Sequence, residues 1–99
     1  MSAREPIGVI GTGYVGLVTA AGFAELGHEV WCIDIDADKV AALRAGRVPI
    51  HEPGLPELVV RHAGRLHFST RLEDALRHAR LLFVAVGTPP TYSTPATPT

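Results

Sequence analysis

The sequence IGVIGTGYVG occupies residues 7–16 and decides the expected fold. Its first four residues form a short β-branched run, which is typical of a strand buried on both faces. The glycines that follow have the spacing G-x-G-x-x-G, and an apolar stretch rich in small residues continues through Leu26. Gly27 is placed to end that stretch in a left-handed conformation. The pattern predicts a strand, a tight glycine turn and a helix that packs closely on a sheet.

An acidic residue stands where such a motif requires one. Asp34 lies eighteen residues beyond Gly16, at the end of a second expected strand over residues 29–34. Strand, glycine loop, helix and acidic residue together are the fingerprint of a dinucleotide-binding site. Gly11 would make the turn, Gly13 would let the backbone approach a pyrophosphate, and Gly16 would let the helix approach the strand. The helix start would attract the phosphates, and Asp34 would accept hydrogen bonds from the adenosine ribose. The alternative is a glycine turn without a ligand.

The rest of the chain alternates between helix and strand patterns. Asp36 is placed to cap a second helix, and Thr70 and Glu73 have the spacing of a capping box. The expected elements are a helix over 37–45 ended by Gly46, a proline-rich loop over 47–56, a short helix over 57–62, a strand over 66–69, a helix from the capping box to Ala79, and a strand over 81–86. We expect an α/β fold, the first half of a Rossmann-like doubly wound parallel sheet, with about four strands in the order 3-2-1-4 and helices on both faces.

Composition limits the classes of function. The 99 residues suffice for one small domain, and 46% of them are hydrophobic, as in core-forming chains. Nine basic and ten acidic residues give a net charge of −1 without a basic stripe, which argues against nucleic acid as a partner. We expect no membrane span, because every apolar run is far shorter than roughly 18 residues, and no signal peptide. The single cysteine, Cys32, cannot form an internal disulfide, so we expect a cytoplasmic protein.

The residues after Asp34 indicate which cofactor is preferred. Sites for NADP usually place an arginine near the ribose, where it pairs with the 2′-phosphate. Here Asp36 and Asp38 follow, which would repel a phosphate, and Lys39 is the only nearby cation. The sequence therefore predicts NAD.

Four stretches together resemble the UDP-glucose/GDP-mannose dehydrogenase family. They are GTGYVGL at residues 11–17, Asp34 with Lys39, PIHEPGL at residues 49–55 and FVAVGTP at residues 83–89. The glycine loop alone is widespread, whereas PIHEPGL and VAVGTPP are more particular to this family. The resemblance runs from about Ile7 to Ser93. One departure is Arg80, where the family more often has an acidic residue.

This resemblance implies oxidation of the C6 alcohol of a nucleotide sugar to a carboxylate, with two NAD used in succession through a cysteine thiohemiacetal. Val15, Asp34, Lys39 and Thr88 match family positions that contact NAD. The family's nucleophilic cysteine, catalytic lysine and asparagine and substrate domain lie further along the chain, so no catalytic residue is assigned. The candidate cofactor-binding residues are Gly11, Gly13, Tyr14, Val15, Gly16, Asp34, Lys39 and Thr88.

Other reactive side chains receive structural interpretations. Cys32 lies inside an expected strand, where a cysteine is usually a small core residue and not a nucleophile. The five histidines show no zinc-like spacing with the lone cysteine. Glu52 has no base or nucleophile beside it in the sequence and is expected to hold its loop. We expect neither a metal site nor a catalytic group.

The favoured function is that of the NAD-binding segment of a UDP-sugar 6-dehydrogenase, with UDP-glucose as the expected substrate and UDP-glucuronate as product. The chain alone is expected to be inactive, and the full-length protein to be a homo-oligomer. Two alternatives stay open: the first part of another NAD-dependent dehydrogenase, and a self-contained nucleotide-binding module without catalysis. We assign residues 1–92 to an incomplete NAD-binding domain. Residues 93–99 form a Thr/Pro-rich tail, which we expect to be disordered and not to continue the natural reading frame; a linker is the alternative.

Overall fold

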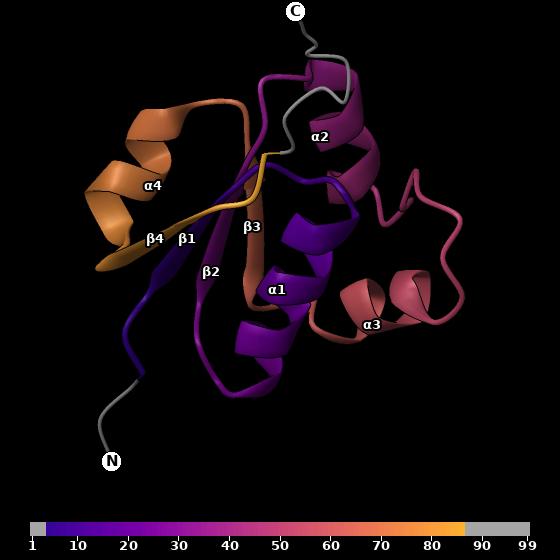
Figure 1. The fold of residues 1–99 in the computed structure, drawn as a ribbon, viewed down its shortest axis with the longest axis horizontal. Helices are drawn as coiled ribbons and strands as arrows, with labels where there is room; N and C mark the ends of the chain where they lie inside the picture. Colours follow the sequence, from indigo (N-terminus) through magenta and orange to yellow (C-terminus); the bar gives the residue numbers. More distant parts are fainter. Residues whose placement is uncertain (1–3, 87–99) are drawn as a thin grey trace, which may run out of the picture.

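Four parallel strands form one sheet in the computed structural model, which describes residues 4–86 (Figure 1). The spatial order is β3-β2-β1-β4, as the sequence predicts. In the register, Ile7 lies between Val30 of one neighbouring strand and Leu81 of the other. The strands are β1 (Ile7–Ile10), β2 (Val30–Ile33), β3 (Leu66–Ser69) and β4 (Leu81–Val84). The expected half of a doubly wound sheet is confirmed. Thr88 and the tail over 93–99 lie outside the described residues.

Helices cover both faces of the sheet. One face packs against α1 (Tyr14–Glu25), α2 (Ala37–Arg44) and α3 (Leu55–Arg61), and the other against α4 (Leu72–His78). Figure 1 shows α4 apart from the other three helices, across the strands. None of these helices, within residues 4–86, has the length and apolar character that a membrane crossing requires.

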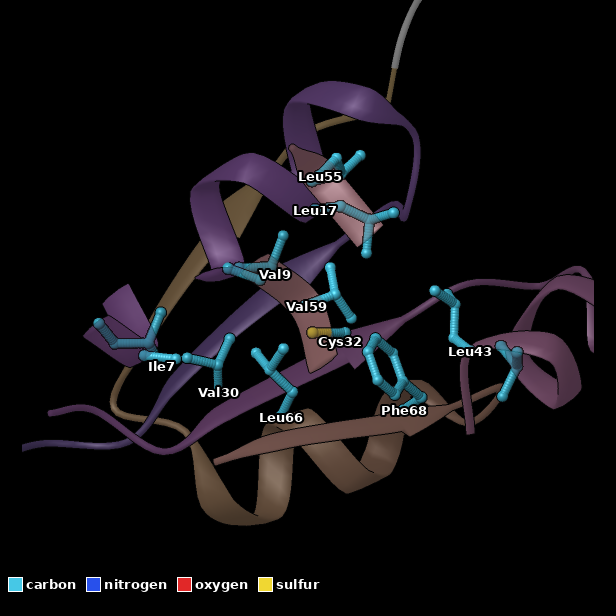
Figure 2. Close-up of a cluster of buried hydrophobic side chains, with 13 residues drawn as sticks. Ile7, Val9, Leu17, Val30, Cys32, Leu43, Leu55, Val59, Leu66 and Phe68 are labelled. Carbon is cyan, nitrogen blue, oxygen red and sulfur yellow. The ribbon is translucent and has the colours of Figure 1, made fainter. Parts of the chain in front are cut away.

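The main core lies between the sheet and α1, α2 and α3 (Figure 2). Side chains alternate along each strand, so Val9 and Cys32 point into this core from adjacent strands. The small buried residues Ala20 and Ala24 of α1 let that helix lie close to the sheet. Val40 and Leu43 of α2 are also buried, as the helical spacing predicts.

A smaller cluster holds α4 on the opposite face. The ring of Trp31 is stacked between His67, with ring centroids 4.3 Å apart, and His78 of α4, at 4.1 Å. The close approach of α4 to β1 depends on Gly8. A Cβ added there would lie 2.5 Å from the side chain of Leu82 on β4 and 3.2 Å from the Cβ of Ala75 on α4. The stacking of His78 on Trp31 and the absence of a side chain at Gly8 therefore position α4 on this face of the sheet.

One helix start and one strand end lie two residues from their predicted positions. The third helix begins at Leu55, two residues before the expected start, because Gly54 at its N-cap has φ 86° and a proline occupies its first turn. Proline is well tolerated there, since its missing N–H would have no partner within the helix. The predicted loop is therefore shorter than expected. The fourth strand ends at Val84, two residues earlier than predicted.

The capping box expected at Thr70 and Glu73 is wrong. The N-cap of α4 is Arg71, and no side-chain capping bond is present at this helix within the described chain. The hydroxyl of Ser69 stabilises the turn before α4 instead. Its Oγ accepts a hydrogen bond from the N–H of Arg71 at 2.9 Å and donates one to the carboxylate of Asp74. The side chain that fixes the turn is thus one residue earlier.

The two edges of the sheet are protected differently. At β3, Nε of Arg44 donates to the carbonyl of Phe68 at 2.8 Å. At β4, all four side chains are exposed and apolar, from Phe83 at 40% to Val84 at 71%. Charged groups on an edge discourage pairing with another chain, and an apolar edge invites it.

We predict that the 99-residue chain associates through β4. Val84→Lys places a charge on this edge and should lower the concentration-dependent association measured by sedimentation. Val60→Lys on α3 is the matched control, because Val60 is also exposed, at 55%, and lies away from the edge. A strictly monomeric chain with concentration-independent unfolding, or an equal effect of both variants, contradicts the prediction.

Candidate functional site

The glycine loop joins the end of β1 to the start of α1. Gly11 has φ 104°, which favours glycine, and its N–H donates to the carbonyl of Ile33 at 2.7 Å. Gly13 is the N-cap of α1 in an extended conformation. Within the described chain, this helix start has neither a side-chain cap nor an acidic residue in its first turn. Its N–H groups and positive dipole end therefore suit an anion.

Steric limits distinguish the three glycines. A Cβ at Gly16 would lie 1.9 Å from the carbonyl oxygen of Gly11, so the start of α1 touches the loop. A Cβ at Gly11 would lie 3.0 Å from Val86 and 3.1 Å from the backbone of Ala85. At Gly13, a Cβ would find no described atom within 4 Å. The backbone is thus crowded inside the loop and open at Gly13.

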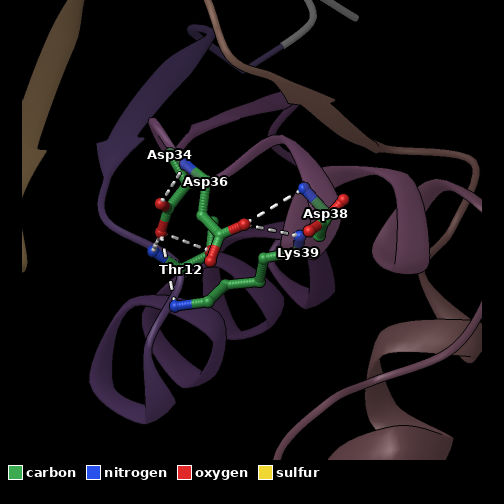
Figure 3. A network of polar contacts seen from close by, with 5 residues as sticks. All are labelled: Thr12, Asp34, Asp36, Asp38 and Lys39. Atoms are coloured by element: carbon green, nitrogen blue, oxygen red, sulfur yellow. Dashed lines mark hydrogen bonds and ion pairs between the residues drawn. The ribbon is translucent and has the colours of Figure 1, made fainter.

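Asp34 joins the loop to the end of β2 (Figure 3). Its Oδ2 accepts the N–H of Thr12 at 2.9 Å and the hydroxyl of Thr12 at 2.7 Å. Its Oδ1 accepts the N–H of Asp36 at 3.0 Å, and Nζ of Lys39 lies 3.7 Å from Oδ2. The side chain is 13% exposed. The carboxylate is therefore held from several sides while part of it stays accessible.

These contacts set the charge of Asp34. Burial would by itself raise the pKa of this carboxyl, but the hydrogen bonds from Asp36 and Thr12 and the charge of Lys39 lower it below the ordinary 3.8. The carboxylate is therefore ionised at neutral pH. Because the folded-state pKa is the lower one, the stabilisation is present near pH 7 and is lost as the pH falls through it.

The start of α2 follows directly from this network. Oδ1 of Asp36 accepts the N–H groups of Asp38 at 3.0 Å and Lys39 at 3.2 Å, which confirms the predicted cap. Asp38 is an acidic residue in the first turn, where the helix dipole favours it. Capping turns Lys39 back toward Asp34, as Figure 3 shows. Asp36 and Asp38 therefore stabilise the start of α2, and the N–H of Asp36 also helps to hold the carboxylate of Asp34.

A mostly apolar pocket of about 230 Å³ opens beside the carboxylate. It lies at the carboxyl ends of β1 and β2, beside the start of α4, and Asp34 is its only charged lining residue within the described chain. Ile35, which is 94% exposed, stands at this pocket. The lining residues are Ile10, Gly11, Ile33, Asp34, Ile35, Thr70, Leu72 and Val86.

The sequence-predicted site residues are brought together, except for one that falls outside the described residues. Tyr14 and Val15 are exposed at the start of α1, next to the glycines, and Lys39 contacts Asp34. Thr88 lies outside the described residues. Sequence reasoning missed Thr12, although a hydroxyl residue between two loop glycines was a usable signal. It also missed Ile35, Thr70 and Leu72 of α4, since their proximity in the pocket depends on the fold.

The residues given structural interpretations are placed accordingly. Cys32 is buried, and burial raises the pKa of its thiol to about 12. Glu52 is exposed in the loop before α3. Two histidines meet single carboxylates, His62 with Glu25 and His67 with Glu29. Among residues 4–86, no three potential ligands are grouped as a metal ion requires.

Known proteins resemble this chain over most of its length. A family model described as UDP-glucose/GDP-mannose dehydrogenase family, NAD binding domain, matches residues 5–97. UDP-glucose 6-dehydrogenase YwqF of Bacillus subtilis is 55% identical over 84% of this chain. A UDP-glucose 6-dehydrogenase of Pseudomonas aeruginosa is 54% identical over 82%. The chain spans about a fifth of the length of these relatives, 19% and 18%.

Solved structures agree with the sequence comparison. A UDP-glucose dehydrogenase from Pyrobaculum islandicum has a TM-score of 0.84 and 46% identity, over 92% of this chain and 22% of its own. A GDP-mannose dehydrogenase from Pseudomonas aeruginosa, solved as a ternary complex, has a TM-score of 0.79 and 38% identity, over 84% and 20%. The fold is therefore shared with nucleotide-sugar dehydrogenases.

Two glycines of α1 provide a matched test of the loop geometry. Gly16→Ala should destabilise the chain by about 1–3 kcal/mol, because its methyl overlaps the carbonyl of Gly11. Gly22→Ala in the same helix meets no described atom within 4 Å and should stabilise it by roughly 0.5–1 kcal/mol. Urea unfolding followed by Trp31 fluorescence measures both. Equal stability of the two variants would show that α1 does not lie close enough to the carbonyl of Gly11 to exclude a methyl group at residue 16.

Proposed function

The chain belongs to the UDP-glucose/GDP-mannose dehydrogenase family, as its NAD-binding domain, and we propose that it serves the oxidation of UDP-glucose to UDP-glucuronate. The open glycine loop beside an ionised Asp34 is the observation that supports it most directly, because this arrangement fits the two chemically distinct parts of NAD. UDP-glucose is favoured as substrate because the relatives from Bacillus subtilis and Pseudomonas aeruginosa, at 55% and 54% identity, are UDP-glucose 6-dehydrogenases.

The pyrophosphate of NAD would lie over Gly13 and the start of α1. The open space at Gly13 admits a ligand close to the backbone. The exposed start of α1, which includes Tyr14 and Val15, supplies N–H groups and the positive end of the helix dipole. Anion binding at this point requires no basic side chain.

The adenosine end would lie beside β2. Oδ1 of Asp34 would accept a ribose hydroxyl, and Lys39 would donate to the same ribose. The apolar pocket beyond Asp34 offers flat surfaces to the purine ring, with Ile35 at its rim. A 2′-phosphate here would meet the charges of Asp34, Asp36 and Asp38, so NAD is favoured over NADP.

The chain's own residues would bind and orient the cofactor. NAD, when bound, accepts the hydride from the sugar alcohol. The one cysteine of the sequence is buried with a pKa of about 12, so it has no thiolate to offer a substrate. Substrate chemistry would therefore fall to other parts of a longer protein, which we propose to be a cytoplasmic homo-oligomer.

The cofactor assignment predicts a specific effect of Asp34. By calorimetry, the chain should bind NAD more tightly than NADP, and Asp34→Ala should weaken NAD roughly tenfold or more, because a charged hydrogen-bond acceptor is lost. Asp38→Ala is the control, since only the main-chain N–H of Asp38 takes part in the network. Equal binding of NAD and NADP, unchanged in Asp34→Ala, would remove the ribose role.

The 99-residue chain is expected to show no dehydrogenase activity. With UDP-glucose and NAD, no NADH should form above the background of a boiled sample, because the one cysteine of the sequence, Cys32, is buried and offers no thiolate nucleophile. Cys32→Ala should behave as the unaltered chain does. NADH formation that disappears in Cys32→Ala would refute both this expectation and the structural role of Cys32.

A further inference from the structure

The hydroxyl of Thr12 is buried against the carboxylate of Asp34. Thr12 is 1% exposed, although it lies in a loop between two glycines. Its hydroxyl and its own N–H both donate to Oδ2, at 2.7 and 2.9 Å. Any residue except proline could supply the N–H at this position, so the hydroxyl is what threonine adds. Figure 3 shows both bonds reaching the same oxygen.

Counting acceptors shows how little of this carboxylate stays free. An ionised carboxylate has about four lone-pair positions, two on each oxygen. The two donors of Thr12 occupy both positions on Oδ2, and the N–H of Asp36 occupies one on Oδ1. Lys39 lies 3.7 Å from Oδ2, an ion-pair distance that is too long for a hydrogen bond. Among the described contacts, one position on Oδ1 is left.

We propose that Thr12 is a positioning residue for nucleotide binding: its hydroxyl fixes Oδ2 inward and thereby presents Oδ1 of Asp34 to a single ribose hydroxyl. This rests on the proposed role of Asp34 at the adenosine ribose. The terminal torsion of an aspartate is broad, so without the hydroxyl the carboxylate could turn about one remaining bond at Oδ2. The lost donor also removes one of the causes that lower the pKa of Asp34.

The first test measures the carboxylate without any ligand. Thr12→Val and Thr12→Ala both remove the hydroxyl, and Thr12→Ser keeps it, so the set stays informative if the valine variant does not fold. A titration of the Asp34 carboxyl carbon by NMR should give a higher pKa in Thr12→Val and Thr12→Ala than in the unaltered chain, and Thr12→Ser should restore it. An unchanged pKa in both hydroxyl-free variants overturns the inference.

The second test uses ADP and 2′,3′-dideoxy-ADP, which differ only in the ribose hydroxyls. Loss of the Thr12 hydroxyl should weaken ADP by about three- to tenfold, leave dideoxy-ADP unchanged, and be reversed in Thr12→Ser. Equal weakening of both ligands means that Thr12 only holds the loop, and overturns the inference while Asp34→Ala still weakens NAD. If the unaltered chain binds both ligands equally and Asp34→Ala has no effect, the proposed ribose role fails, and this inference fails with it.

Discussion

The contact between Gly16 and the carbonyl of Gly11 is the constraint on which the rest of this structure depends. A Cβ at Gly16 would lie 1.9 Å from that oxygen, so α1 can begin at this height above the sheet only with glycine there. With its start fixed, the helix presents Ala20 and Ala24 to the strands at close range. The same contact directs the start of α1 toward the edge formed by the carboxyl ends of the strands, where a doubly wound sheet binds its ligands.

Asp34 has a structural role and a proposed binding role, and both draw on the same carboxylate oxygens. Its contacts with Thr12 tie together two segments that are 22 residues apart in sequence. Its contact with Asp36 leads directly into the cap of α2. A carboxylate that performs all of these functions has little freedom to rotate, which makes it a well-oriented acceptor and a restricted one. Removing Asp34 would therefore change the loop as well as any ribose contact.

The sequence predicted the sheet better than the helix boundaries and the glycine loop better than the pocket. Local patterns of apolar residues identify the strands and helices, and the alternation of the two with right-handed crossovers leads to the strand order of a doubly wound sheet. The start of α3 was misplaced because Pro56 was interpreted as loop, although it lies in the first turn of a helix. At α4, Ser69 competes with Thr70 for the turn, and only the fold determines which of them meets Asp74. The pocket joins residues from four parts of the chain, and no spacing rule connects them.

The difference between the two edges bears on where a dinucleotide can lie. The order of the strands reverses at β1, which has β2 on one side and β4 on the other. Ligands of doubly wound sheets cross this point at the carboxyl ends of the strands. Asp34 lies at the end of β2, and the apolar pocket beside it extends from there across the end of β1 to Val86. At the far edge of the sheet, Arg44 covers β3. On the β4 side, the described chain offers an exposed apolar strand and no polar side chain on β4 itself. Under the proposed function, the adenosine half and the pyrophosphate would lie at Asp34 and the glycine loop, and the nicotinamide half would extend past β1 toward the unprotected edge at β4.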